Sequence, residues 1–336
     1  MRERYLLGMT AVPFVVAAFL PGALLAGNEV TRFEDPEIVE SSGLVVDDGL
    51  LVTTNDSGDS GRVFTVDPAT GDTLGVTQWA ADPVDVEALA PADGGEVWVG
   101  DIGDNRAERP SVSVARVPVG RGNRDVDVPS YELVFPEGPR DAESLMADPA
   151  TDQLYVVSKG VFGGTVYAAP ARLRADRPNQ LTEVGPVLPI ATDAAFFPDG
   201  RHVIVRSYSE AAVYSWPELD EVGRFGLPDQ QQGEGIAVDP LDETIYASSE
   251  GLHAPVLRIS LPPAVRSAMK PPVASPTPSP SVTPSVTPSV TPAPGNRVGT
   301  ELPEEPPTER SAWGWALGGL LGLGIVIVLV RAVRPR

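Results

Sequence analysis

The stretch "DVEALAPADGGEVWVGDIG" at residues 85–103 holds a short apolar run, a turn rich in Asp, Pro and Gly, and a second run in which apolar residues alternate. This pattern is typical of two strands joined by a tight reversal. The same order recurs in "ESSGLVVDDGLLVTTNDSG" from residue 40, "DAESLMADPATDQLYVVSKG" from 141, "TDAAFFPDGRHVIVRSYS" from 192 and "QGEGIAVDPLDETIYASSEG" from 232. The chain therefore repeats one unit five times.

Further strands are predicted in each repeat. Third strands are expected from about residues 62, 111, 165, 212 and 256, and fourth strands near 72–78, 130–135, 180–185 and 220–225. The fifth repeat has no fourth strand of its own, whereas "NEVTRFED" (28–35) precedes the first repeat. Pairing of this segment outside the fifth repeat would join the two ends of a ring and remove free sheet edges.

Units of roughly 40 to 56 residues with three or four strands and almost no helical periodicity predict an all-β fold, a β-propeller with one blade per repeat. Five blades account for every strand. Six blades stay open if residues 118–140 hide an extra hairpin.

Composition limits the possible partners and chemistry. The formal net charge is −21 and the pI about 4.4, which disfavours nucleic acid as a partner. The absence of cysteine excludes disulfides, thiolate metal sites and cysteine nucleophiles.

Both ends of the chain carry membrane signals. Residues 1–27 predict a signal peptide or an uncleaved signal anchor, and 28–265 form the predicted propeller. Residues 266–311 are a Pro/Thr/Ser-rich segment, expected to be a disordered stalk, and the uncharged run 312–330 predicts a transmembrane helix. The basic tail 331–336 then places the C-terminus in the cytoplasm. We therefore expect a single-pass protein of the cell membrane with an extracellular globular domain, facing the cell wall or an extracellular ligand.

Acidic residues recur at two aligned positions of the repeat. One position holds Ser42, Glu87, Glu143, Ala194 and Glu234, and the position two residues earlier holds Glu40, Asp85, Asp141, Thr192 and Gln232. The innermost strands of a propeller line its channel, so these side chains are expected to converge. Their repulsion must be relieved by water, raised pKa values or a cation. Oxygen ligands without Cys or His favour Ca²⁺, with a solvated rim as the alternative.

Two loops that follow second strands add oxygen ligands. They read "TNDSGDSG" (54–61) and "GDIGDN" (100–105) and contain Asn55, Asp101 and Asn105. The first lacks the Glu that an EF-hand loop needs, and both also suit ordinary strand-end turns.

Catalytic motifs are weaker. The sequence has no Gly-x-Ser-x-Gly elbow, and His202 and His253 stand apart from any nucleophile motif, so structural roles are expected for both. Trp79, Trp98 and Trp216 are expected to pack between blades.

The motifs "SSGL…TNDSGDSGRVF", "DVEAL…VGDIGDN" and "DAESL…LYVVSK" resemble secreted actinobacterial propeller proteins, grouped loosely with the esterase-like phytase-type propellers. A Glu that opens the inner strand is more distantly similar to the metal-binding Glu of gluconolactonase-type propellers. That resemblance implies channel calcium held by Glu87, Glu143 or Glu234, with Asn55, Asp101 or Asn105 completing the ligand shell. The phytases use several lysines for phosphate, and this domain offers Lys159 alone, so no substrate is implied.

Two functions are compatible with these features. The favoured one is a calcium-binding module that binds an extracellular ligand, because no nucleophile or base can be named. The alternative is a metal-dependent hydrolase of esters, lactones or phosphoesters that uses channel calcium as a Lewis acid.

Overall fold

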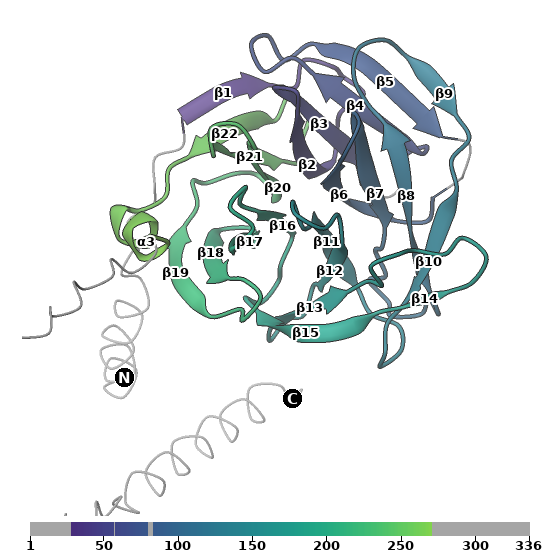
Figure 1. Cartoon of the computed structure of the whole chain (residues 1–336). Helices are drawn as coiled ribbons and strands as arrows, with labels where there is room; N and C mark the ends of the chain where they lie inside the picture. The colour runs from purple at the N-terminus through teal and green to yellow at the C-terminus, as the bar shows by residue number, and fades with distance from the viewer. Residues whose placement is uncertain (1–27, 57, 80–82, 271–336) are drawn as a thin grey trace, which may run out of the picture. The chain divides into compact units, whose positions relative to one another are not determined.

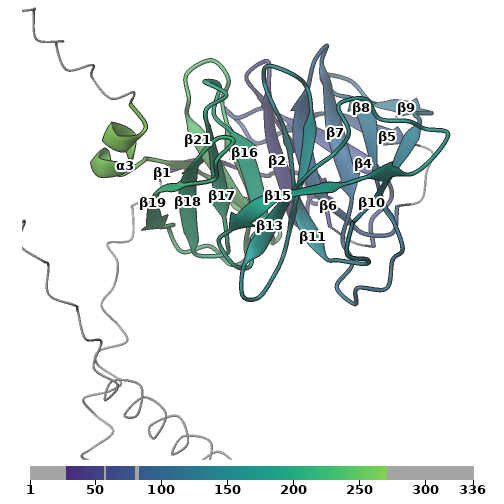
Figure 2. The same cartoon turned by 60° about the horizontal axis from the view of Figure 1, so that its bottom comes forward.

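A computed structural model describes residues 28–56, 58–79 and 83–270. These residues form five sheets arranged in a ring around a central axis (Figures 1 and 2). The innermost strands of neighbouring sheets contact one another around the whole ring. The predicted five-bladed β-propeller is therefore confirmed.

Each blade has four antiparallel strands, which follow one another from the channel outward. Blade 1 consists of β2 (Ser41–Asp47), β3 (Leu50–Asn55), β4 (Arg62–Val66) and β5 (Thr73–Trp79). Blade 2 consists of β6 (Val86–Ala92), β7 (Glu96–Asp101), β8 (Val112–Pro118) and β10 (Ser130–Val134). Blade 3 consists of β11 (Ala142–Ala147), β12 (Leu154–Ser158), β13 (Gly164–Ala168) and β15 (Thr182–Val187). Blade 4 consists of β16 (Asp193–Phe196), β17 (His202–Arg206), β18 (Glu210–Ser215) and β19 (Glu221–Gly226).

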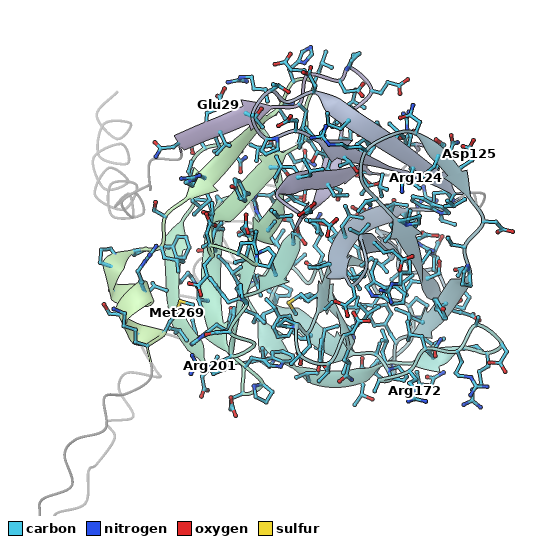
Figure 3. The ribbon with its side chains drawn as sticks, turned by 45° about the horizontal axis from the view of Figure 1, so that its top comes forward. Glu29, Arg124, Asp125, Arg172, Arg201 and Met269 are labelled. Atoms are coloured by element: carbon cyan, nitrogen blue, oxygen red, sulfur yellow. The ribbon has the colours of Figure 1, made fainter. Side chains whose placement is uncertain are left out.

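Blade 5 joins the two ends of the domain. Its strands are β20 (Gly233–Val238), β21 (Ile245–Ser249), β22 (Pro255–Ile259) and, outermost, β1 (Asn28–Arg32). β1 runs antiparallel to β22, with Asn28 opposite Arg258 and Arg32 opposite Pro255. The predicted closure of the ring by the N-terminal segment is confirmed, and Figure 3 shows Glu29 on this outer strand.

Residues 118–140 do not form a sixth blade. Their additional strand, β9 (Arg124–Val126), lies parallel to β5 on the outer edge of blade 1. β14 (Asn179–Gln180) lies parallel to β10 on the outer edge of blade 2 in the same way. Each of these short strands therefore covers a sheet edge of the preceding blade.

Five apolar clusters fill the five interfaces between blades. One lies between blades 1 and 2 and includes Trp79, and the next, between blades 2 and 3, includes Trp98. Trp216 packs against the cluster between blades 3 and 4. The remaining two lie between blades 4 and 5 and between blades 5 and 1. The predicted packing role of the three tryptophans is confirmed.

The inner strands approach one another closely at two glycines. A Cβ atom on Gly43 of β2 would overlap the backbone of Leu89 in β6, and one on Gly235 of β20 would overlap Leu44 in β2. Only glycine permits such backbone contact. Blade 1 is thereby held tightly against both of its neighbours.

A short helix, α3 (Pro263–Ala268), follows β22 and runs across the predicted boundary at residue 265. Its buried Val265 packs beside Gly223 of β19, so the helix covers the outer edge of blade 4. Within the described part of the chain, no helix has the length and apolar character needed to cross a membrane. The predicted signal at 1–27, most of the stalk and the predicted span at 312–330 lie outside the described residues.

Candidate functional site

Glutamates open the inner strands of three blades at one end of the channel. Glu87 lies in β6, Glu143 in β11 and Glu234 in β20, and their exposed fractions are 5%, 4% and 5%. Each occurs where the pairing with the second strand shifts register, as at a β-bulge. The same shift occurs at Ser42 but not at Ala194. Bulges re-aim side chains, so the channel geometry and the aligned glutamates belong together.

Three carboxylates from blades 1 and 2 form the tightest group. One oxygen from each of Asp56, Asp85 and Glu87 can be chosen so that all three lie within 4.8 Å of one another. Asp56 follows β3, and Asp85 directly precedes β6. Three hard, anionic oxygen donors of this kind suit Ca²⁺, which takes six to eight oxygen ligands and accepts water among them. The residues therefore fit a calcium ion by their donor chemistry.

The electrostatics of this group favour a positive ligand. Burial, together with the charges of Glu143, Asp56, Asp85 and Glu234, raises the pKa of Glu87 to about 11. Burial and the Asp56 and Asp141 charges raise the pKa of Asp85 to about 6. The Ser42 hydroxyl donates to the Glu87 backbone carbonyl at 2.7 Å and lies 3.3 Å from its carboxylate. One hydroxyl does not offset four negative neighbours, whereas a divalent cation would.

The environment of Glu143 differs from that of Glu87, because the side chain of Lys159 contacts the Glu143 carboxylate. The Lys159 ammonium donates to the Glu143 carboxylate and, at 2.7 Å, to the Tyr208 hydroxyl. Burial raises the pKa of Glu143 to about 8, against the opposing effect of Lys159. Burial lowers the pKa of Lys159, but the neighbouring Glu143 carboxylate raises it, and the resulting pKa lies above the ordinary value of lysine. The ammonium therefore stays charged and neutralises this part of the channel.

Glu234 continues the polar wall into blade 5. Its carboxylate accepts a hydrogen bond from the Gln232 amide at 3.1 Å, and the same amide nitrogen donates to Glu250 at 2.6 Å. Burial raises the pKa of Glu234 to about 7, while Gln232 and Lys159 lower it. The Gln232 amide and the Lys159 charge therefore stabilise the ionised form of Glu234.

The other predicted ligands hold loops. Asp101 accepts hydrogen bonds from the Val84 and Asp85 amides and pairs with Arg109 at 2.9 Å. Asp141 accepts from the Asp104 amide at 2.9 Å. These two aspartates orient the residues beside the candidate site.

The two predicted asparagine ligands have different environments. The Asn55 side chain accepts from the Val39 and Glu40 amides and donates to the Glu37 carbonyl and Asp59. Asn105 lies exposed in the loop after β7. The Asn55 amide is thus already engaged in four hydrogen bonds of its own loop region.

Three further candidate residues do not lie at the two aligned acidic positions of the repeat, but directly after the second strands of their blades. Asp56, Lys159 and Glu250 come directly after β3, β12 and β21, where the chain faces the start of the inner strand of the same blade. Each backbone amide at these positions donates to the residue two before the channel position, for example Lys159 to Asp141 at 3.0 Å. Aligning the repeats at this point would have shown them.

The histidines have structural contacts. The His202 imidazole lies 2.7 Å from the Asp199 carboxylate in the turn before β17, and that of His253 lies 3.0 Å from the Phe33 carbonyl. These contacts are compatible with the structural roles predicted for both.

Fold and site together define a five-bladed β-propeller with a carboxylate-lined channel. No family model and no curated protein matches the chain. Among solved structures, the chain is similar to glutaminyl cyclase from Myxococcus xanthus, with 12% identity, a TM-score of 0.46, and coverage of 70% of this chain and 97% of that one. It is also similar to a glucose dehydrogenase, with 9% identity, a TM-score of 0.43, and coverage of 71% and 100%. Neither likeness carries an argument about function.

Proposed function

We propose that the propeller binds a calcium ion between blades 1 and 2, with Asp56, Asp85 and Glu87 as ligands, and presents it to an extracellular ligand. The observation that supports this proposal is the approach of three carboxylate oxygens to within 4.8 Å around a buried glutamate. The charges of the neighbouring carboxylates strongly oppose ionisation of Glu87. In the described structure, the Lys159 ammonium contacts Glu143 and not Glu87. A divalent cation bound by these oxygens relieves the repulsion around Glu87.

Thermal unfolding with and without calcium tests the proposal. At a hundred times its dissociation constant, calcium that binds only the folded state adds about 2.7 kcal/mol. For a domain of this size that corresponds to a rise in Tm of roughly 5 to 10 °C. Magnesium should give a smaller rise, because it demands octahedral geometry and gives up water reluctantly.

Matched variants locate the ion. Glu87→Gln should abolish the calcium shift and raise the metal-free Tm, because glutamine keeps nearly the same shape without the cost of burying an acid among like charges, which Glu87 can avoid only by taking up a proton on folding. Glu183→Gln on the exposed strand β15 should keep the full calcium shift and is the control. A calcium shift that survives Glu87→Gln would place the ion elsewhere or leave the carboxylates as a hydrated rim.

A second candidate function is a calcium-dependent hydrolase of esters, lactones or phosphoesters. The observation that favours it is the contact of Glu143 with Lys159, which in turn contacts Tyr208, beside the carboxylate group. Glu143, with its pKa raised to about 8, could exchange a proton near neutral pH. A screen of the three substrate classes, with calcium and with chelator, separates the two candidates. Calcium-dependent turnover that is lost in Glu143→Gln would establish the hydrolase.

We also propose that the domain is displayed outside the cell on its stalk and held by a C-terminal span. The support is the sequence alone: an export signal, a Pro-rich segment, and an apolar run followed by arginines. Protease added to intact cells should cut the stalk and release a fragment of about the size of the propeller. A propeller that is protected until the cells are lysed would contradict this topology.

A further inference from the structure

The channel has a second opening at the opposite end, where the inner strands finish. A cavity of about 460 Å³ lies there, within the range of roughly 300 to 1,000 Å³ in which small-molecule sites fall. All five inner strands or the turns that follow them contribute to its lining. None of the residues of the calcium proposal lines it, so the two ends of the channel are separate sites.

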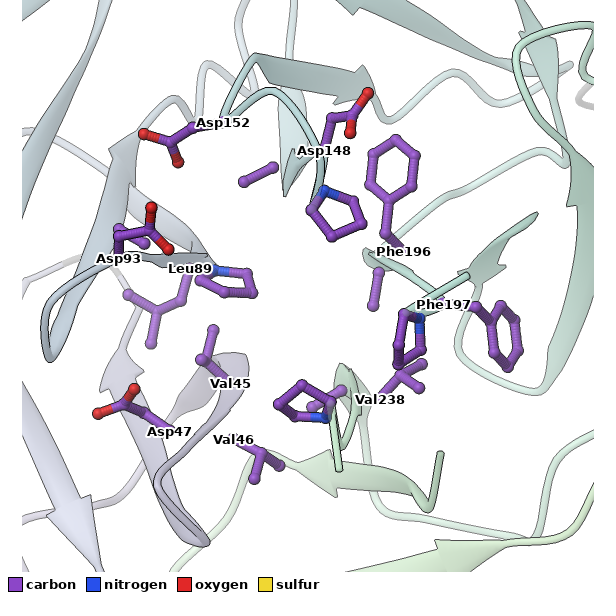
Figure 4. A pocket seen from close by; sticks show the side chains of 18 of the residues that line it. Val45, Val46, Asp47, Leu89, Asp93, Asp148, Asp152, Phe196, Phe197 and Val238 are labelled. Atoms are coloured by element: carbon purple, nitrogen blue, oxygen red, sulfur yellow. The ribbon is translucent and has the colours of Figure 1, made fainter. Parts of the chain in front are cut away.

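The inside of this cavity is apolar. Each blade places at least one apolar side chain in the wall, which is formed in ring order by Val45, Leu89, Ala147, Phe196 and Val238. Figure 4 shows Val45, Leu89 and Phe196 around the central space. Phe196 packs against Tyr155 in a tilted contact and against Trp216 edge-on, with ring centroids 6.0 and 5.0 Å away. The wall is therefore preformed and offers burial to an apolar ligand.

The mouth of the cavity is negatively charged. Five aspartates line it, namely Asp47, Asp48, Asp93, Asp148 and Asp152, and Figure 4 shows four of them around the opening. The described lining includes no lysine, arginine or histidine. Among their carboxylates in the described structure, only that of Asp152 lies within ion-pair distance of a basic group, Arg116 at 3.8 Å, and the same guanidinium donates to the Asp93 backbone carbonyl at 2.5 Å. Asp148 also stabilises its turn, because its carboxylate accepts a hydrogen bond from the Ala150 amide. Burial and the neighbouring charge of Asp48 raise the pKa of Asp47.

We propose that this cavity binds a small organic cation, with its apolar body against the wall and its ammonium group among the aspartates at the mouth. An anion of the same shape meets like charges, and a neutral ligand gains only the burial. A cation gains the burial and the attraction together. This inference stands independently of the calcium site.

Three probes of similar shape and different charge test the ligand class. We expect 2-phenylethylammonium to bind more tightly than 2-phenylethanol, and 3-phenylpropionate to bind least, in isothermal titration calorimetry with the full folded chain. Because the aspartates are partly exposed, the preference for the cation should shrink as salt rises from roughly 0.02 to 0.5 M. Equal binding of all three probes, or tighter binding of the anion, would overturn the proposal.

Variants of the lining residues place the probe. Asp47→Asn combined with Asp93→Asn removes two charges at the mouth and should weaken the ammonium probe roughly three- to tenfold, with little effect on the alcohol. Ala147→Phe should fill the cavity and abolish binding of both. Glu183→Gln, on the exposed strand β15, should leave the affinity unchanged. Full retention of the ammonium probe in the double Asn variant, or undiminished binding in Ala147→Phe, would overturn the assignment.

Discussion

The carboxylate of Asp193 in blade 4 accepts a hydrogen bond from the backbone amide of Ile236 in blade 5, at 2.7 Å. It accepts a second from the Ala194 amide at 2.8 Å, and only 1% of Asp193 is exposed. In a second contact between these blades, blade 4 provides the donor: the guanidinium of the fully buried Arg206 donates to the Gly235 carbonyl of blade 5 at 2.9 Å. Burial lowers the pKa of Arg206 to about 10, against the charges of Glu234 and Asp193. Blades 4 and 5 are therefore joined by polar contacts beneath the channel wall.

Asp193→Ala should destabilise the domain strongly. It leaves two buried amides without their acceptor, and each stranded donor costs about 1 to 3 kcal/mol. Urea unfolding should show a loss of roughly 2 to 5 kcal/mol, with an intermediate loss in Asp193→Asn, which keeps one acceptor oxygen. The exposed Asp220→Ala, as control, should change stability by less than about 0.5 kcal/mol. A loss in Asp193→Ala no larger than that of the control would contradict the bridging role.

Without metal, the domain should lose stability as the pH rises from 5 to 8. The pKa values of Asp85, Glu234 and Glu143 are raised to about 6, 7 and 8. The folded state therefore binds protons more tightly than the unfolded chain, and this stabilisation disappears as the pH passes through those values. The opposite effect, from the lowered pKa values of Asp59 and Asp199, acts below the ordinary carboxyl range.

Melting curves in chelator measure this. Each pKa unit is worth about 1.4 kcal/mol, so the Tm at pH 8 should lie several degrees below that at pH 5. Saturating calcium should reduce or reverse the difference, because the ion binds the deprotonated carboxylates. A metal-free Tm that rises between pH 5 and 8 would mean that the channel carboxylates are not repelled.

Lys159 should limit the channel to one divalent cation. Its ammonium occupies the side bordered by Glu143 and Tyr208 and lowers the pKa of Glu234 across the channel. Lys159→Met removes that charge and should lower the metal-free Tm. It should also raise the calcium stoichiometry in calorimetry from one to two.

The chain offers a matched control, since Lys270 is its only other lysine and lies exposed after α3. Lys270→Met should leave both the Tm and the stoichiometry unchanged. An unchanged stoichiometry in Lys159→Met would show that the lysine does not stand in for a second ion.

The closing strand should be essential to the propeller. A chain that starts at Glu40 loses β1 and also the fully buried Phe33 and Ile38, which fill the cluster between blades 5 and 1. It should melt well below a chain that starts at Asn28, and it should aggregate through the exposed edge of β22. Equal melting temperatures and equal solubility of the two chains would contradict the role of β1 in closure.

Most of the fold could be predicted from the sequence repeat. Turns with fixed Asp, Pro and Gly residues and strands of alternating polarity place four strands per blade, and the missing fourth strand of the last repeat predicts the closure. β9 and β14 could not be predicted in this way, because each has only two or three residues and is fixed by a neighbouring blade's edge. Helix α3 is a single short segment that depends on its contact with β19.

The candidate site was predicted in part. The structure brings Glu87 and Asp85 together as aligned channel residues, but their partner Asp56 comes from the end of another strand in another blade. Lys159 changes the environment of Glu143. This contact could not be predicted from the aligned positions of the inner strands, because Lys159 follows the second strand of the blade. Asn55 met the compositional criterion for a ligand, yet its amide is engaged in local turns.

The pairing of β1 with β22 also constrains the order in which the domain can form. The ribosome makes Asn28 early and its partner Arg258 some 230 residues later, as counted from their positions. Until that partner has been synthesised, β1 has no neighbour in its sheet and the ring stays open. The closed ring can therefore form only after synthesis of the propeller is complete, whatever order the other blades follow.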